Sequence, residues 1–266
     1  MSPFNFLDRY AYEHRPFLHG GGRKATEQLI TMLELHGRES VLEIGNGTGA
    51  TQVRLKSIYP GLDLHGIERS SIMYLKAISR LKWALLPTNQ LHLMDDPVDA
   101  LPFAAETFDL VFFESVLGIL SIHEIRSILS EIRRVLKPGG KLALNESMWL
   151  SGISSDMIHD INNQCKALYG IRLAQEEIKT IQDWQAFLSY EGFDIKSTRL
   201  VNPVSKPYGY GFRDLLSLTY TYLGKMKTIF NKEIKAREKR FRTTMKTRAM
   251  QEKQYIDAYL MVLKMK

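Results

Sequence analysis

The residues with the clearest chemical meaning lie in one stretch, Val41–Ala50, with the sequence VLEIGNGTGA. Gly45, Gly47 and Gly49 carry no side chain that would keep a ligand away from the backbone, and glycine permits the positive φ of a tight turn. The helix predicted to begin near Thr48 directs its free amides and the positive end of its dipole at this turn. The stretch therefore predicts a cofactor site at the end of a buried strand.

Two kinds of cofactor fit this turn. The spacing Gly45-x-Gly47-x-x-Ala50 matches the fingerprint for dinucleotides, and Glu68 lies about twenty residues further on, where an acid holds a ribose. The spacing Glu-x-Gly-x-Gly-x-Gly, which begins at Glu43, instead resembles motif I of the class I S-adenosylmethionine-dependent methyltransferases. An acid inside the strand end suits the methionine ammonium of that cofactor, which a pyrophosphate lacks. The turn alone leaves both alternatives open.

Further polar residues follow other predicted strands. Glu114 comes directly after the apolar run Phe108–Phe113, and Asn145 and Glu146 lie at the end of the run Lys141–Asn145. The carboxyl ends of parallel strands meet at the edge where α/β proteins bind ligands. Glu114 is therefore a candidate for a base, for a partner of a cationic substrate, or for a cap on the following turn. Asn145 and Glu146 are candidates for substrate contacts or for turn residues.

Alternating strands and helices must position these residues. Apolar runs predict strands, and apolar spacings of three and four predict helices. The predicted strands are 41–44, 62–67, 91–94, 108–113 and 141–145, and the predicted helices are 23–36, 51–59, 71–85, 121–136, 156–169 and 176–190. This alternation predicts an α/β fold with a doubly wound parallel sheet.

The order of the motifs resembles the class I methyltransferase series throughout. EIGNGTG is followed by an acid after the second strand, by DALPFAAETFDLV and by LKPGGKLAL, from about Gly20 to Ile195. The resemblance is to the small-molecule, methyltransferase type 11-like members. It implies a seven-stranded Rossmann-like sheet whose antiparallel seventh strand is 257–266. It also argues against the dinucleotide alternative. It implies S-adenosylmethionine as cofactor and S-adenosylhomocysteine as product.

The resemblance also assigns roles to the acids at strand ends. Glu43 would lie near the methionine ammonium, and Glu68, beside Arg69, would bind both ribose hydroxyls. An acid after the third strand would bind the adenine amino group, and one extra residue in the spacing leaves Asp95 and Asp96 as candidates, with Asp96 favoured. The expected cofactor contacts are Glu43, Gly45, Asn46, Gly47, Gly49, Glu68, Arg69, Asp95, Asp96 and Glu114.

The candidate catalytic residues are Glu114 and His19. A histidine that several related small-molecule enzymes carry soon after the fourth strand is absent, because Gly118-Ile119 stands there. His19 precedes three glycines, in a segment that resembles the His-Pro-Gly-Gly of some relatives with glycine in place of proline. A hinged arm would carry His19 over the cofactor, with Tyr10 and Tyr12 beside it and Tyr12 as a substrate contact. Packing of the arm's aromatic side chains into the core is an equal alternative.

The chain divides into four segments. They are an N-terminal arm over the cofactor site (1–22), a cofactor-binding methyltransferase core (23–203), an aromatic and basic helical insertion between strands six and seven (204–255), and the final strand of the core (256–266). The insertion is expected to form a lid or an interface. Tyr208 in its aromatic opening is a candidate substrate contact, and Trp149 is either a substrate contact or a core residue.

Positive charge is concentrated in the insertion. The net charge of the chain is +7, and Lys225–Lys253 holds 11 Lys/Arg against 3 Asp/Glu, so the remainder is close to neutral. A basic helix there, with an apolar stripe, would form a solvated face, a docking site for nucleic acid or an anionic membrane, or a lid that attracts an anionic substrate. Nucleic acid is not favoured, because no Asn/Asp-Pro-Pro-aromatic run follows the fourth strand.

Composition limits the remaining possibilities. Cys165 is the single cysteine, so neither an internal disulfide nor a cysteine-based metal site can form. No set of His, Asp and Glu has the spacing of metal ligands, and no metal is expected. The N-terminal residues lack the apolar run of a signal peptide, and no stretch approaches the ~20 apolar residues of a membrane span. A cytoplasmic protein is therefore expected.

These observations predict methyl transfer to an O, N or C nucleophile of a small or lipid-like molecule. Peripheral membrane contact and a homo-oligomer are both left open. The alternative is an RNA-directed methyltransferase or accessory subunit that docks through the basic helix 225–253. A third hypothesis is a protein that binds S-adenosylmethionine without transferring its methyl group.

Overall fold

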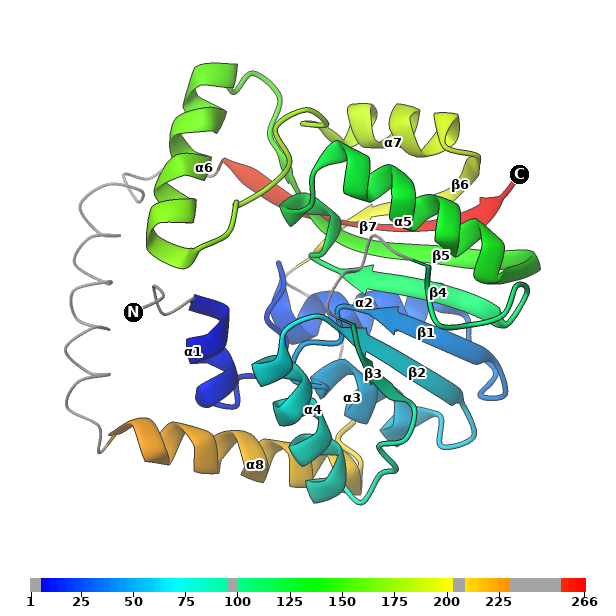
Figure 1. Ribbon diagram of the computed structural model, residues 1–266, viewed down its shortest axis with the longest axis vertical. Helices are drawn as coiled ribbons and strands as arrows, with labels where there is room; N and C mark the ends of the chain where they lie inside the picture. The colour runs from blue at the N-terminus through cyan, green and yellow to red at the C-terminus, as the bar shows by residue number, and fades with distance from the viewer. Residues whose placement is uncertain (1–5, 95–99, 203–208, 230–254) are drawn as a thin grey trace.

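The computed structural model describes residues 6–94, 100–202, 209–229 and 255–266, which form one sheet with helices around it (Figure 1). The sheet has seven strands in the order β3-β2-β1-β4-β5-β7-β6. β1 to β5 run parallel, whereas β7 is antiparallel to both of its neighbours. The predicted fold class is confirmed, including the antiparallel seventh strand. The strands are β1 (Ser40–Ile44), β2 (Asp63–Glu68), β3 (Leu91–Leu93), β4 (Phe108–Glu114), β5 (Leu136–Trp149), β6 (Phe193–Leu200) and β7 (Ile256–Met265).

Hydrophobic clusters lie on both faces of the sheet. Because successive residues of a strand point to opposite faces, Val41 and Leu42 pack in different clusters. One cluster includes side chains of α5 and α7, and the other includes side chains of α2 and α3. The helices are α1 (Phe6–Tyr12), α2 (Gly22–Leu33), α3 (Ala50–Ile58), α4 (Ser71–Trp83), α5 (Ile122–Val135), α6 (Ser155–Tyr169), α7 (Ile181–Tyr190) and α8 (Phe212–Ile229), with a short 3-10 turn, η1 (Leu117–Ile119).

Most elements lie within about three residues of their predicted bounds, and two differ more. The helix predicted over 176–190 begins only at Ile181, because Thr180 caps it: the Thr180 side chain accepts the Asp183 N–H, and Asp183 accepts in return. The strand predicted over 141–145 is part of the longer β5, since β5 pairs with β7 well beyond that run. The apolar pattern used for the prediction includes neither the capping pair Thr180 and Asp183 nor the pairing with β7, and these set the two boundaries.

The register of the sheet brings the chemically interesting residues to one edge. β1 lies between β2 and β4, and the glycine turn follows β1. Glu68 ends β2, Glu114 ends β4, and Asn145 pairs with Glu114 across β4 and β5. The side chains predicted to form a site therefore meet at the carboxyl ends of the central strands, as expected for an α/β fold.

The described part of the insertion, α8, is attached to α3 and α4 by two buried arginines. The Nη1 of Arg54 donates to Oδ2 of Asp214 at 2.5 Å. The Nη1 of Arg80 donates to the hydroxyls of Ser217 at 2.8 Å and Thr221 at 3.0 Å. In Figure 1 α8 lies along the lower edge of the molecule, next to α3 and α4.

Several predicted features fall outside the described residues. These are Asp95, Asp96 and Tyr208, and residues 230–254, which make up most of the predicted basic helix 225–253. Within the described residues, no helix is both long enough and apolar enough to cross a membrane.

Candidate functional site

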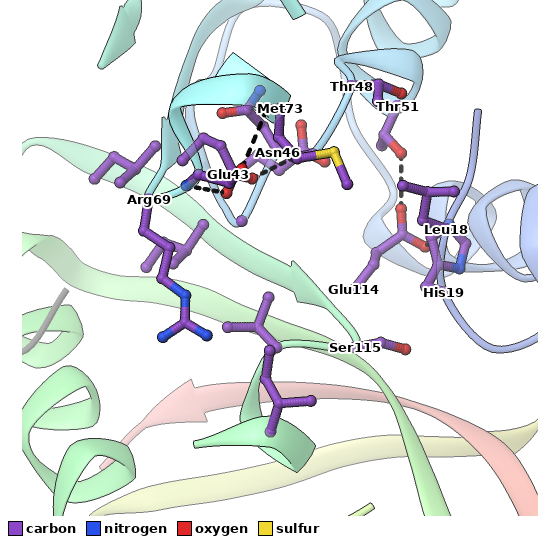
Figure 2. A pocket seen from close by; sticks show the side chains of 18 of the residues that line it. Leu18, His19, Glu43, Asn46, Thr48, Thr51, Arg69, Met73, Glu114 and Ser115 are labelled. Carbon is purple, nitrogen blue, oxygen red and sulfur yellow. Dashed lines mark hydrogen bonds and ion pairs between the residues drawn. The ribbon is translucent and has the colours of Figure 1, made fainter. Parts of the chain in front are cut away.

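A cavity of about 260 Å³ opens at the carboxyl ends of β1, β2 and β4 (Figure 2). Its wall combines the glycine turn, the ends of β2 and β4, and the segment that precedes α2. The lining residues are Phe17, Leu18, His19, Glu43, Ile44, Gly45, Asn46, Gly47, Thr48, Ala50, Thr51, Ile67, Glu68, Arg69, Ser70, Met73, Glu114, Ser115, Val116, Ile119, Leu120, Ile128, Gly170 and Ile171. Segments far apart in sequence thus form one pocket.

Two glycines of the turn have different reasons to lack a side chain. A Cβ on Gly45, at φ 76°, would approach Cγ2 of Val116 to 2.5 Å, so this glycine permits close packing of two loops. A Cβ on Gly47, at φ 52°, would meet no atom within 4 Å. Gly47 lines the cavity, so the space beside it is open to a ligand. The structure thus places the predicted turn where a cofactor can approach the backbone.

Glu68 is held in one orientation by backbone amides. Its Oε2 accepts the N–H of Gly47 and its Oε1 accepts the N–H of Ser70, both at 2.8 Å. Burial raises the pKa of Glu68, whereas the amides and the neighbouring Arg69 lower it. Each carboxylate oxygen keeps further acceptor capacity, and two adjacent hydroxyls need two fixed acceptors. The arrangement fits the role that the sequence predicts for Glu68, and Arg69 stands on the same wall of the pocket.

Glu43 and Asn46 have polar atoms without a partner. The Oε2 of Glu43 and both amide atoms of Asn46 are buried and make no hydrogen bond to any described residue. Burial raises the pKa of Glu43 well above its ordinary value, and the charges of Glu114 and Glu68 raise it further. Buried polar groups without partners are costly and rare. A ligand with a positive charge and hydrogen-bonding groups would satisfy them, and S-adenosylmethionine has both.

Glu114 lies in a network of buried donors on the other side of the cavity. Its carboxylate accepts hydrogen bonds from the hydroxyl of Thr26 at 2.9 Å and from the amide nitrogen of Asn145 at 3.1 Å. It also accepts from the hydroxyl of Thr51 at 2.9 Å (Figure 2). The Nε2 of His19 lies 3.2 Å from its Oε2. The structure therefore brings together Glu114, His19 and Asn145, three of the candidates predicted from sequence.

The same network orients the ring of His19. The Nδ2 of Asn145 faces two acceptors, Glu114 and the carbonyl of Gly20, so its orientation is fixed. This nitrogen also lies 2.9 Å from Nδ1 of His19. The single hydrogen of the Thr26 hydroxyl is directed at Glu114, so its oxygen accepts from Nε2 of His19, which therefore carries the proton and leaves Nδ1 as an acceptor. Nε2 then faces Oε2 of Glu114 and the hydroxyl of Thr26. Both ring nitrogens have partners inside the protein.

Glu146 contacts the protein backbone rather than the cavity. Its two oxygens accept the N–H groups of Val116 and Leu117 at 2.8 Å and of Gly118 at 3.2 Å. Burial raises the pKa of Glu146 to about 7, although these three amides oppose the shift. Because Val116 lines the cavity, Glu146 fixes the loop that forms one wall.

The remaining predicted substrate contacts lie elsewhere. Trp149 is buried and its Nε1 donates to the carbonyl of Gln175 at 2.6 Å, in a cluster with Ile158 and Ala174. Tyr12 is exposed on α1, and neither residue lines the cavity. Asp95, Asp96 and Tyr208 lie outside the described residues, so the structure says nothing of their positions.

Sequence reasoning missed the two threonines that bind Glu114 and the apolar wall of the cavity. Thr51 lies in the first turn of the helix after the glycine motif, and that position could have marked it. Thr26 has no such signal, because it lies 88 residues from Glu114 in the chain. The apolar wall is made of Phe17, Leu18, Ile119, Leu120 and Ile171. Among the described residues, no group of three or more His, Cys, Asp and Glu could hold a metal ion.

Comparisons with known proteins agree with this geometry. A family model described as a methyltransferase domain matches residues 41–140. An uncharacterized methyltransferase of Bacillus subtilis is 30% identical over 178 residues, 66% of this chain and 68% of that protein. A ubiquinone/menaquinone biosynthesis C-methyltransferase of Syntrophotalea carbinolica is 30% identical over 138 residues, 52% of this chain and 56% of that protein. The chain spans about half the length of several curated relatives that it matches.

Solved structures share the fold at lower identity. A phosphoethanolamine N-methyltransferase of Haemonchus contortus, in complex with phosphomonomethylethanolamine and S-adenosylhomocysteine, aligns with a TM-score of 0.65 at 18% identity. The alignment covers 98% of this chain and 57% of that one. The family match, the Bacillus relative and the strand order exclude the dinucleotide alternative that the glycine turn had left open. The chain belongs to the class I S-adenosylmethionine-dependent methyltransferases, and S-adenosylmethionine is its cofactor.

Proposed function

We propose that this chain transfers a methyl group from S-adenosylmethionine to an O, N or C nucleophile of a small or lipid-like molecule. The observation that carries the proposal is the cavity itself. Three buried carboxylates, Glu43, Glu68 and Glu114, face it, and its other wall is apolar. Such a cavity favours two ligands side by side, a positively charged one near the carboxylates and an apolar one near the opposite wall.

The residues of the glycine turn and of β2 would hold the cofactor. Gly47 leaves the space, Glu68 would accept from the ribose hydroxyls, and Glu43 and Asn46 would bind the amino-acid end. When bound, S-adenosylmethionine supplies an activated methyl group, so the protein has mainly to align the reactants and exclude water. For the adenine amino group, Asp95 and Asp96 stay the proposed partners.

The acceptor would occupy the apolar side of the cavity. Phe17 and Leu18 come from the segment before α2, Ile119 and Leu120 from the loop after β4, and Ile171 from the chain after α6. We therefore propose that residues 1–22 form an arm over the cofactor site. The positions of Phe17 and Leu18 in the cavity wall support this proposal. The name of the Syntrophotalea relative refers to quinone biosynthesis, and an apolar acceptor is consistent with that relationship.

Glu114 and His19 would act together if the acceptor must lose a proton. Glu114 is held by several donors, and His19 Nε2 lies 3.2 Å from it. Since Nδ1 of His19 accepts from Asn145, a substrate proton could reach the pair only at Glu114 or after displacement of the Thr26 hydroxyl. We propose Glu114 as the proton acceptor and His19 as the residue that positions it.

The test has a binding step and a turnover step. Thermal unfolding with S-adenosylmethionine, S-adenosylhomocysteine and NAD should show a shift of roughly 2–4 °C with the first two ligands only, at about 100 times the dissociation constant. Release of S-adenosylhomocysteine is then followed with quinols, phosphoethanolamine and prenyl diphosphates as acceptors. Binding of the cofactor without turnover of any acceptor class would favour the non-transferring alternative, and a shift with NAD alone would overturn the proposal.

The proton-transfer role is tested with the active acceptor. Glu114→Gln should lower kcat far more than KM and remove the acidic limb of the pH–rate profile. Thr51→Val, which removes one donor to Glu114 and keeps its charge, is the matched variant and should shift that limb without removing it. An unchanged profile in both variants would show that Glu114 is not the proton acceptor.

A further inference from the structure

α8 is amphipathic with its polar side facing the protein. The buried residues Asp214, Ser217 and Thr221 recur at spacings of three and four, so they lie on one side of the helix. Their partners are the guanidinium groups of Arg54 and Arg80, which the core supplies from α3 and α4. A helix on a protein surface ordinarily turns apolar side chains inward and polar ones outward. In α8 the inward side is mainly polar, with Tyr220, which stacks on His14, as its buried aromatic residue.

The opposite side of α8 exposes apolar and aromatic side chains, which we call the α8 outer face: Phe212, Leu215, Leu218, Tyr222 and Leu223. Each leaves 43–67% of its surface exposed. Scattered single apolar residues are normal on a protein surface, but a continuous stripe indicates an interaction site.

The outer face continues onto α4. The indole Nε1 of Trp83 donates to the hydroxyl of Thr219 at 3.0 Å, and nearly half of the Trp83 surface is exposed. Trp83 also lines a shallow hollow with Leu223, Met226 and Lys227. Tryptophan and tyrosine rings with one polar end are typical of boundaries between an apolar phase and water.

Charge distinguishes the candidate partners of this face. Residues Lys225–Lys253, which begin in the last turns of α8, carry a net charge of +8, while the rest of the chain carries about −1. Within α8 itself Lys225 and Lys227 are exposed, and Lys227 lines the hollow beside Trp83 and Leu223. A second copy would bring like charges to the interface, whereas an anionic surface complements them. Basic residues next to an apolar and aromatic helix face are typical of helices that lie in a membrane interface.

We propose that the α8 outer face docks on the surface of an anionic phospholipid bilayer. α8 would lie parallel to the surface, with Phe212, Leu215 and Tyr222 among the head groups and the buried side still bound to Arg54 and Arg80. The interaction needs neither cofactor nor turnover, so the proposal stands independently of the proposed methyl transfer. It explains why apolar side chains are exposed on a helix whose polar side chains are buried.

The test is flotation of the full chain with vesicles in the absence of cofactor. The chain should float with vesicles of phosphatidylcholine and phosphatidylglycerol and much less with pure phosphatidylcholine, and salt above the physiological ~0.15 M should weaken binding. The triple variant Leu215→Ser, Leu218→Ser and Tyr222→Ser should lose on the order of a hundredfold in affinity, since three half-exposed side chains no longer enter the interface.

Matched controls distinguish a loss of docking from a loss of folding, and specific docking from nonspecific binding through other exposed apolar side chains. Tyr190→Ser and Leu200→Ser remove exposed apolar side chains from α7 and β6, and both should leave vesicle binding unchanged. The triple variant should keep the melting temperature and the S-adenosylhomocysteine affinity of the wild type, because all three side chains point away from the core.

Four results would overturn the proposal. The first is that the chain fails to float with anionic vesicles, and the second is that the triple variant floats as well as the wild type. The remaining two would identify a different partner. Light scattering shows a dimer that the triple variant loses, in which case a second copy covers the outer face. Generic RNA binds with an affinity that the triple variant weakens in the same measure, in which case the face belongs to a nucleic-acid site.

Discussion

The cavity and the region under α8 both bury charge, and they treat it in opposite ways. In the cavity, Glu43, Glu68 and Glu114 lie close enough that the last two raise the pKa of the first, and Glu43 keeps an oxygen without a partner. Under α8, Arg80 is completely buried, and none of its hydrogen-bond acceptors is a carboxylate.

The acceptors of Arg80 nevertheless satisfy it. Its Nε donates to the carbonyl of Thr48 at 2.8 Å, Nη2 to the carbonyl of His14 at 2.6 Å, and Nη1 to the hydroxyls of Ser217 and Thr221. Burial lowers the pKa of Arg80 to about 10, so it still carries its charge at neutral pH. Arg80, whose buried charge has a full set of partners within the fold, is therefore structural, whereas the unpartnered oxygen of Glu43 indicates a ligand.

The two regions meet at one residue. Thr48 lines the cavity, its carbonyl accepts from Arg80, and its hydroxyl donates to the carbonyl of Arg15 at 2.7 Å. The glycine turn, the N-terminal segment and α8 are thus joined through a single guanidinium. Substitutions that remove charge from one region or the other should therefore have different consequences for stability and for cofactor binding.

The largest effect is expected for Arg80→Met. Several buried oxygens on α8, in the glycine turn and at His14 after α1 would lose their donor, and each buried acceptor without a donor is costly, so unfolding should become easier by roughly 3 kcal/mol or more. Urea denaturation measures this change. Arg126→Met, which removes an exposed arginine paired with Glu191, is the control and should change stability by less than about 1 kcal/mol. Equal effects of the two variants would refute a structural role for Arg80.

The second prediction concerns the open space beside Gly47. Gly47→Val should weaken S-adenosylhomocysteine binding on the order of a hundredfold, since the new side chain occupies the cavity while its Cβ meets no protein atom. Gly139→Val is the matched control, because Gly139 also has a positive φ and open space but lies near the start of β5 and does not line the cavity. Calorimetric titration should show wild-type affinity for the control. Similar loss in both variants would mean that backbone strain, not the cavity, controls binding.

The third prediction follows from the pKa of Glu146, about 7 in the folded protein against an ordinary 4.5. A carboxyl whose pKa is raised by folding adds stability that is complete below its unfolded pKa and is lost as the pH rises through about 7. The free energy of unfolding should therefore fall across that window, by on the order of 3 kcal/mol or less. Glu43 and Glu68, whose pKa values burial also raises, act in the same direction.

Glu146→Gln separates these contributions. The amide keeps one acceptor oxygen for the N–H groups of Val116 and Leu117 and cannot titrate. Urea denaturation at a series of pH values should then show a shallower slope than in the wild type. An unchanged slope would assign the pH dependence to the carboxylates of the cavity alone.

The sequence predicts the elements of this fold and the acids of its cavity because both are local signals. Strand ends can be recognised from apolar runs, and the carboxyl ends of parallel strands converge, so Glu43, Glu68 and Glu114 were expected together and do line one cavity. Their partners cannot be recognised in this way. Thr26 and Thr51 contact Glu114 across 88 and 63 residues, and neither belongs to a motif with chemical meaning.

Orientation is the second kind of information that the sequence lacks. Asn145 and Glu146 are neighbours on β5 and point to opposite sides, so one binds Glu114 and the other binds a loop backbone. Spacing alone does not decide which of the two contacts Glu114, and neither lines the cavity. The apolar stripe predicted for the basic helix 225–253 lies almost wholly outside the described residues. In α8 the core presents Arg54 and Arg80 to the helix, so a polar side is buried, and the local sequence contains no sign of these partners.

The smallest effect is expected for Glu43→Gln, and it tests the comparison most directly. Because burial and two neighbouring carboxylates raise the pKa of Glu43 well above its ordinary value, glutamine resembles the side chain of the free protein and should not lower stability. Binding of S-adenosylhomocysteine should weaken about tenfold, since a carboxylate can ionise beside the ligand ammonium and an amide cannot. Urea denaturation and calorimetric titration of this variant measure the two quantities. A large loss of stability with unchanged affinity would place Glu43 among the structural charges, beside Arg80, and remove the contrast between the two regions.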